Sequence, residues 1–272
     1  MKQLNKPDHK KTALYLALLA GVLFLMFMLK QCSSKSPYAH IAPSHSGGDT
    51  VDVAIEYSPL LLYRYADTLG GFNYDMLRMI AHEEGMAIKF HPLTALPEAL
   101  KGLDDGLYDI VVADVAGSTD FQQNYSVTEP VYIDRQVLVQ LKDSAMLNST
   151  LELGGKEVWV SSNASVLSRL KNLSAEIGDS IIVRQDSIYG SEQLVMLVAT
   201  GDIPRAVVNE TVAEAMAKDY DNIDVSTKVS FSQFQPWLLR KDNNELTTRL
   251  DSAIVRFKKT QAFQTLYSRY FN

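Results

Sequence analysis

The chain has 272 residues, a formal net charge of −6, 46% hydrophobic residues and a single cysteine, Cys32. This composition is typical of a packed globular protein, and one cysteine excludes a structural disulfide within the chain. Residues 1–35 hold six Lys and one Asp, a balance of +5, so the remaining residues carry −11. An acidic domain repels phosphate backbones, which argues against a nucleic-acid partner.

The first distinctive segment is an uncharged, strongly apolar run from Thr12 to Leu29. Its 18 residues, at about 1.5 Å each, would span about 27 Å as a helix, close to the thickness of a hydrocarbon core. Four Lys precede it and only Asp8 opposes them, so the positive-inside rule places the N-terminus in the cytoplasm. We therefore predict a cytoplasmic tail at residues 1–11 and a single transmembrane anchor at residues 12–29. The C-terminal domain would then lie in the periplasm, held at the cell inner membrane.

Two other interpretations of this segment stay open. A cleaved signal peptide has a shorter apolar region and a small-residue cleavage site, which residues 28–31 do not offer. A lipoprotein would be acylated at Cys32, although Lys30 and Gln31 precede it where small residues are expected. Residues 30–50 are rich in Ser, Gly and Pro and are predicted to form a flexible linker.

From residue 51 onward, segments with strand and helix patterns alternate, which predicts a mainly parallel α/β sheet. The first set comprises strands at 51–56, 86–90, 108–113 and 135–140 and helices at 74–84 and 96–103. The alternation then starts afresh, with strands at 158–160, 181–183, 206–208 and 237–239 and helices at 166–177, 191–200, 211–218, 246–257 and 262–270. Two α/β units in one chain favour a ligand site in the cleft between them.

Six short motifs, in order along residues 51–272, resemble those of the family 3 extracellular solute-binding proteins, periplasmic receptors typical of polar amino acid uptake. They are Tyr57-Ser58-Pro59, Gly71-Phe72-x-x-Asp75, Gly106-x-x-Asp109-Ile110, Glu129-Pro130-Val131-Tyr132, Gly201-Asp202-Ile203 with Ala206-Val207-Val208-Asn209, and Tyr267-x-x-Tyr270-Phe271. The resemblance implies the two-lobed α/β, type II periplasmic-binding-protein-like fold, with two hinge crossovers and ligand-driven closure. It places lobe 1 at 51–137 and 236–272, lobe 2 at 141–232, and the hinge near 139–142 and 232–235.

The same resemblance suggests which residues contact the ligand. An aromatic at Tyr57 would stack on it, and a turn containing Ser162 and Ser165 would offer N–H groups at a helix N-terminus. The family Arg that grips a ligand carboxylate falls on Phe121 or Gln122, and the family Asp that pairs with the ligand ammonium aligns with Asn209. The candidate ligand-binding residues are Tyr57, Asp114, Ser118, Thr119, Gln122, Ser162, Ser165, Asn209 and Glu210.

Three of these candidates have structural alternatives. Tyr57 could pack on the first helix, Asp114 could stabilise a turn after its strand, and the turn with Ser162 and Ser165 could simply cap its helix. Both charged anchors for an α-amino acid are absent from the pattern, and Asp114 adds a carboxylate. Arg64 and Arg135 are the basic residues that could replace the missing Arg.

Patterns that indicate catalysis are weak. The five His show no metal-ligand spacing, and no phosphate-binding loop or dinucleotide fingerprint is present. Ser168-x-x-Lys171 occurs without the companion motifs of the enzymes that use it. We predict no cofactor, no metal site and no enzymatic activity, although a hydrolase of unrecognised chemistry is not ruled out by sequence.

We predict a membrane-anchored envelope solute-binding protein that clamps a small polar ligand, other than a plain α-amino acid, and presents it to a transporter or sensor. An alternative comes from residues 208–213 and 235–240, which resemble the substrate-binding-like half of membrane-bound lytic transglycosylase F. A lysozyme-like catalytic domain follows in that protein, whereas the present sequence ends at Asn272. The alternative is therefore a non-catalytic regulator that binds cell-wall fragments.

Overall fold

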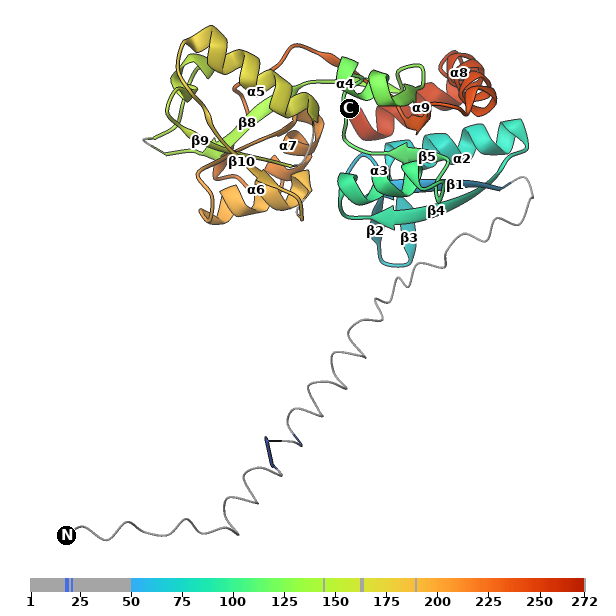
Figure 1. Ribbon diagram of the computed structural model, residues 1–272, viewed down its shortest axis with the longest axis horizontal. Helices are drawn as coiled ribbons and strands as arrows, with labels where there is room; N and C mark the ends of the chain where they lie inside the picture. The colour runs from blue at the N-terminus through green and yellow to red at the C-terminus, as the bar shows by residue number, and fades with distance from the viewer. Residues whose placement is uncertain are drawn as a thin grey trace, which may run out of the picture. The chain divides into compact units, whose positions relative to one another are not determined.

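The computed structural model describes residues 18, 19, 21, 50–143, 145–161, 164–188 and 190–271. Residues 1–46 and 47–272 form separate units by their internal contacts. The predicted tail, anchor and linker lie outside the described residues, apart from Leu18, Leu19, Gly21 and Thr50. Within the described part of the chain, no helix has the length and apolar character needed to cross a bilayer. The rest of the described chain forms two α/β lobes (Figure 1).

Lobe 1 is built on a five-stranded sheet in the order β4-β1-β5-β14-β6. Its strands are β1 (Thr50–Glu56), β4 (Ala87–Leu93), β5 (Ile110–Val112), β6 (Tyr125–Val127) and β14 (Leu238–Arg240). β1 runs parallel to β4 and β5, whereas β14 is antiparallel to its neighbours. A hairpin of β2 (Tyr63–Tyr65) and β3 (Thr68–Gly70) and a short helix, α4 (Thr119–Asn124), complete the lobe with its four longer helices.

Alternation along β1 separates two cores in lobe 1. Val53 and Ile55 face the larger apolar cluster, with α2 (Phe72–Glu84), α8 (Asn244–Phe257) and α9 (Gln261–Phe271). Ala54 faces the other cluster, with α3 (Leu96–Asp104). The sheet is therefore covered on both faces, as its continuous apolar strands require.

Gly71 fixes the joint between β3 and α2. Its φ of 135° lies in a region that favours glycine, and a Cβ there would lie 2.4 Å from the Leu61 carbonyl oxygen. The Gly71 N–H donates to the Tyr270 hydroxyl at 3.0 Å, and that hydroxyl donates to Asp75 Oδ2 at 2.8 Å. The C-terminal helix α9 is thereby tied to the first turn of α2.

Lobe 2 has a second five-stranded sheet in the order β10-β9-β11-β8-β12. Its strands are β8 (Gln136–Leu141), β9 (Glu157–Ser161), β10 (Ile182–Asp186), β11 (Arg205–Asn209) and β12 (Ile223–Asp224). α5 (Ala164–Ile177) packs on one face with Leu138 of β8, and a single 3-10 turn, η1 (Thr150–Leu153), adds Leu153 to that core. On the other face, α6 (Ser191–Thr200) and α7 (Glu210–Ala217) lie over a core that includes Val137 and Val139.

The two crossovers form an antiparallel ribbon of β7 (Tyr132–Asp134) and β13 (Gln233–Gln235). Tyr132, Asp134 and Gln235 are buried, whereas Ile133 and Phe234, which are register partners, are 55% and 60% exposed. The ribbon therefore has a buried face and a solvent face. β8 pairs with β11 and β12, so it belongs to lobe 2 and the first crossover precedes residue 136. For this crossover, the predicted hinge at 139–142 and the predicted end of lobe 1 at residue 137 are therefore wrong.

Candidate functional site

Polar side chains of both lobes meet where three strands end. β1 ends at Glu56, Asp114 follows β5, and β11 ends at Asn209. Ligands of open α/β sheets bind beyond the carboxyl ends of such strands. Asn209 Nδ2 donates to Asp114 Oδ1 at 3.0 Å, and the two residues are 5% and 8% exposed. This buried hydrogen bond joins lobe 2 directly to lobe 1.

The hinge ribbon and β1 each contribute a hydrogen bond that positions Asp114. The Tyr132 hydroxyl donates to Asp114 Oδ1 at 3.4 Å, and the Asp114 N–H donates to Glu56 Oε2 at 3.4 Å. Asn73 hydrogen-bonds Tyr132 and accepts from Trp237 Nε1 at 2.8 Å. A chain of buried polar contacts thus runs from the lobe 1 core to Asp114 and restricts its position.

The site is dominated by carboxylates with raised pKa values. Burial, and next the charge of Asp114, raise the pKa of Glu56 to about 8. Burial, and next the charge of Asp134, raise the pKa of Asp114 to about 7, against hydrogen bonds from Asn209 and Tyr132 that lower it. Glu192, in the first turn of α6, also has a raised pKa because of burial, and its charge acts on both. A neighbouring cation would have lowered these pKa values, and no cation from the described part of the chain is among the causes of the shifts.

Asp134 marks the hinge side of the site. The Thr211 hydroxyl donates to its Oδ2 at 2.5 Å and the Arg135 N–H to its Oδ1 at 2.8 Å, so Asp134 holds the first turn of α7. Burial nevertheless raises the pKa of Asp134 to about 6. Next to it, Arg135 Nε pairs with Glu210 Oε2 at 2.7 Å. A groove of about 510 Å³ opens here between the lobes, lined by Pro59, Leu60, Tyr63, Ile133, Asp134, Glu210, Thr211, Glu214, Ala215, Lys218, Arg269, Tyr270 and Phe271.

Two buried polar groups of the site have no hydrogen-bond partner among the described residues: both amide atoms of Gln235, and Ser118 Oγ. Gln235 pairs with Tyr132 in the hinge ribbon, so the two side chains share the face that contacts Asp114. The Gly117 N–H donates to the Phe234 carbonyl oxygen at 2.9 Å, which brings Ser118 beside the same ribbon. Buried polar groups are normally hydrogen-bonded, so these atoms are suited to contact a ligand.

The nine predicted residues separate into groups. Asp114, Ser118 and Asn209 come together in the cleft, and Ser165 is buried in the first turn of α5. Tyr57 is partly buried and packs against the lobe 1 core, while Thr119 and Gln122 are exposed on α4. Glu210 pairs with Arg135 beside the groove. Ser162 lies outside the described residues.

Five residues of the site were not predicted from the sequence: Glu56, Tyr132, Asp134, Glu192 and Gln235. Glu56 had a usable signal, because it is the last residue of a predicted strand and directly precedes Tyr57. Of the basic residues proposed to replace the missing Arg, Arg64 is exposed on β2 and Arg135 is engaged with Glu210.

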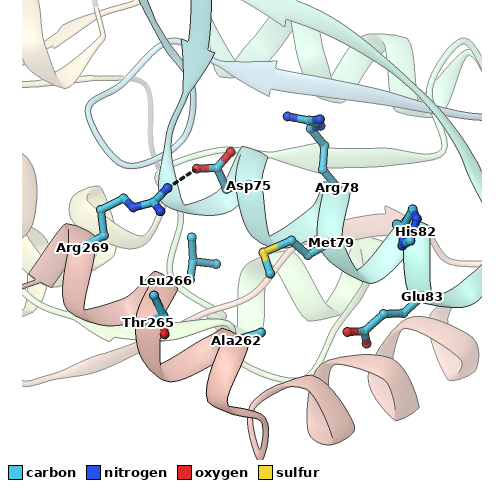
Figure 2. A pocket seen from close by; sticks show the side chains of 9 residues that line it. All are labelled: Asp75, Arg78, Met79, His82, Glu83, Ala262, Thr265, Leu266 and Arg269. Atoms are coloured by element: carbon cyan, nitrogen blue, oxygen red, sulfur yellow. Dashed lines mark ion pairs between the residues drawn. The ribbon is translucent and has the colours of Figure 1, made fainter.

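A larger groove, of about 550 Å³, lies on lobe 1 alone between α2 and α9 (Figure 2). Its residues are Asp75, Arg78, Met79, His82 and Glu83 from α2 and Ala262, Thr265, Leu266 and Arg269 from α9. Arg269 Nη1 pairs with Asp75 Oδ2 at 3.8 Å across it. Both walls belong to one lobe, so this groove cannot sense lobe closure, and the interlobe site is the better candidate.

Two α/β lobes, a two-stranded hinge and a polar site between the lobes define a periplasmic-binding-protein fold of type II. The chain belongs to the bacterial extracellular solute-binding proteins, family 3, whose family model matches residues 50–272. The resemblance seen in the sequence is thereby confirmed. Proteins of this family bind solutes and are usually not catalysts.

Individual relatives are distant. The chain is 22% identical over 219 residues to membrane-bound lytic murein transglycosylase F of Shewanella pealeana, covering 79% of this chain and 45% of that protein. It thus spans about half the length of the transglycosylases that it matches. It is also 22% identical over 227 residues to the L-cystine-binding protein of Bacillus subtilis, covering 82% of this chain and 80% of that protein.

Solved structures share the fold. An ancestral arginine-binding protein bound to arginine superposes with a TM-score of 0.73 at 21% identity, covering 83% of this chain and 99% of that one. A putative L-cystine ABC transporter protein from Listeria monocytogenes gives a TM-score of 0.72 at 18% identity, covering 82% and 96%.

Proposed function

We propose that this chain is a membrane-anchored receptor of the bacterial envelope that closes its lobes on a small polar solute other than a free α-amino acid. The observation that carries the proposal is the pairing of Asn209 with Asp114. In the family, an Asp at the position of Asn209 holds the ligand ammonium and an Arg near Gln122 holds the ligand carboxylate. Here the first is an amide and the second is missing.

The electrostatics of the site point the same way. A ligand carboxylate placed beside Asp114 and Glu56 would be repelled once these groups are ionised, and it would raise their pKa values further. Of the two basic candidates, Arg64 is exposed and Arg135 is paired with Glu210. A hydrogen bond to a charged group contributes about 1.5–3 kcal/mol, so the missing Arg alone would weaken binding by about one to two decades. Among the proteins compared, the arginine-bound neighbour and the L-cystine-binding relative have amino acid ligands by their names, which makes free amino acids the class to test first.

Calorimetry on the full-length chain in detergent, with the twenty amino acids, dipeptides, amines and muropeptides, tests this proposal. We expect micromolar binding from a class other than free α-amino acids, together with a shorter distance between spin labels on the two lobes. Micromolar binding of a free α-amino acid would contradict the proposal. Loss of that binding in Arg64→Ala or Arg135→Ala would identify the residue that replaces the family Arg.

We further propose that residues 12–29 anchor the receptor, with residues 1–11 in the cytoplasm, residues 30–50 as a tether and residues 51–272 in the periplasm. The distribution of Lys around the apolar run supports this orientation, as does the extracellular location of the family. Mass spectrometry of the native membrane-extracted protein checks it. A mature N-terminus at an acylated Cys32 would replace the anchor by a lipid. The bound solute would be passed to a transporter or a sensor in the same membrane.

A second candidate function is regulation by cell-wall fragments without catalysis. It is supported by the several relatives that are membrane-bound lytic murein transglycosylases F. The calorimetric panel separates the two functions, because muropeptides that bind more tightly than amines and dipeptides would favour this one.

A further inference from the structure

We propose that the solute is an aliphatic amine with at least two ammonium groups and no carboxylate, the diamine and polyamine class. This inference rests on the proposed function and names the ligand class of the same cleft. It is carried by a row of carboxylates that runs through the site from lobe 2 to the hinge, together with buried polar groups that lack partners.

The order of the row follows from one hydrogen bond, from the closeness of Gly190 to Glu56, and from the charges that act between its members. Glu192 of lobe 2 acts on Glu56 and Asp114 of lobe 1. Glu56 accepts the Asp114 N–H at 3.4 Å, and Asp134 in the hinge acts in turn on Asp114. Gly190, the residue before α6, lies so close to Glu56 that an added Cβ would be 3.3 Å from Glu56 Oε1. Carboxylates of both lobes and the hinge are thus neighbours at the place where the lobes meet, and Asp134 of this row also lines the interlobe groove.

No cation among the described residues is a cause of the raised pKa values of Glu56 and Glu192, whereas Lys218 and Arg269 line the groove at the Asp134 end of the row. Besides burial, the charges that raise the pKa values of Glu56 and Asp114 come from other carboxylates, and burial raises the pKa of Glu192. The guanidinium of Arg135, which follows Asp134 in the chain, is paired with Glu210. A ligand with one ammonium could face only one or two of the carboxylates. A row that extends from Glu192 to Asp134 is better matched by a ligand with two separated positive charges.

Two of the partnerless atoms, Gln235 Oε1 and Ser118 Oγ, are acceptors and so have the polarity that an ammonium needs, whereas Gln235 Nε2 is a donor. An ammonium group offers three donors and no acceptor, so its site must supply acceptor atoms. Gln235 is 2% exposed, and both its amide oxygen and its amide nitrogen lack partners among the described residues. It is the register partner of Tyr132, so it lies on the same face of the hinge ribbon as the side chain that contacts Asp114. Ser118 Oγ adds a further buried acceptor at the same ribbon.

Two other ligand classes fit less well. A divalent metal needs several oxygen ligands that converge on one point, and no three acidic, His or Cys side chains of the described chain do so. A zwitterionic amino acid would bring its own carboxylate into the row. An amine without a carboxylate avoids that repulsion and keeps all of the attraction.

The test is calorimetry on the full-length chain in detergent with putrescine, cadaverine and spermidine, beside arginine, glutamine, a neutral dipeptide and a disaccharide-peptide muropeptide. We expect a diamine or polyamine to bind at least about 10-fold more tightly than arginine. Glu56→Gln and Asp114→Asn should each weaken that binding by about 10- to 100-fold, the size expected for one charged hydrogen bond. Both amides keep the shape of the acid, and thermal melts verify folding. As a control, Glu83→Gln, an exposed change on α2, should bind the same amine with an affinity within about twofold of the parent.

The pH gives a second readout. Because the pKa values of Glu56 and Asp114 are raised to about 8 and about 7, bound ammonium must displace protons, and amine affinity should rise from pH 6 to pH 8. Binding of the dipeptide or muropeptide without any amine binding would overturn this inference and leave the proposed function standing. Micromolar binding of a free α-amino acid would overturn both. Amine binding that neither Glu56→Gln nor Asp114→Asn weakens would also refute the inference, because it would place the amine elsewhere.

Discussion

Replacing Asp114 by Asn should stabilise the ligand-free protein at neutral pH. Burial and the charge of Asp134 raise the pKa of Asp114 from 3.8 to about 7. The folded protein therefore keeps a proton that the unfolded chain releases above about pH 4, so the free energy of unfolding falls as the pH rises from about 4 to about 7. At about 1.4 kcal/mol per pKa unit, the loss amounts to about 4 kcal/mol above pH 7. This value is an upper limit, because lobe opening returns water to the carboxylate.

Asn at this position carries no such penalty and keeps an acceptor for Asn209 and Tyr132. The stability difference between variant and parent should thus be small at pH 4.5 and largest at pH 8. Urea unfolding of the full-length chain, followed by tryptophan fluorescence, measures it, because Trp159 reports on lobe 2 and Trp237 on lobe 1. Asp219→Asn, an exposed change on lobe 2, controls for net charge. A difference that does not vary with pH, or a variant less stable than its parent at pH 8, would refute the reasoning.

Three further predictions concern the scaffold and the anchor. Gly71→Ala should destabilise the protein by more than about 3 kcal/mol, since it adds a clash with the Leu61 carbonyl to an unfavourable φ; an unchanged melting temperature would contradict this. Trp237→Phe should cost about 1–3 kcal/mol in urea unfolding, because Asn73 Oδ1 loses its buried donor, and equal midpoints would argue that Asn73 finds another. Removal of residues 1–29 should move the protein from the membrane to the soluble fraction, and retention in the membrane would show that another part of the chain attaches it.

Most of the fold could be predicted because its elements carry strong local signals. The apolar spacing over 191–200 matches α6, and the apolar run at 206–208 lies within β11. The first crossover could not be located in this way. β8 is buried on both faces and would look the same in either lobe, and the neighbouring ribbon is only three residues per strand. β8 belongs to lobe 2 because it pairs with β11 and β12, which are distant in sequence.

The candidate site was predictable where the family pattern assigns a role to a position. Asp114 and Asn209 stood out because they occupy positions of known role, and the structure joins them. Glu192 did not, since an acidic residue in the first turn of a helix is ordinarily favoured by the helix dipole. Its connection with Glu56 exists only because the lobes come together, and no sequence spacing records that approach.

The acidic row has a consequence for how the lobes close. Carboxylates from two separate lobes repel when ionised, so bringing them together without a ligand requires that protons remain on some of them. Burial is the largest cause of the raised pKa values of Glu56 and Asp114, and the charge of Glu192 from lobe 2 adds to it. The hydrogen bond between Asn209 and Asp114 offsets only part of this cost because it joins a single pair. A ligand with separated ammonium groups would remove the repulsion at several points at once. A solute without positive charge would leave the repulsion between the carboxylates in place, so it would favour the closed state less strongly. Lobe closure and ligand recognition would then have the same physical origin.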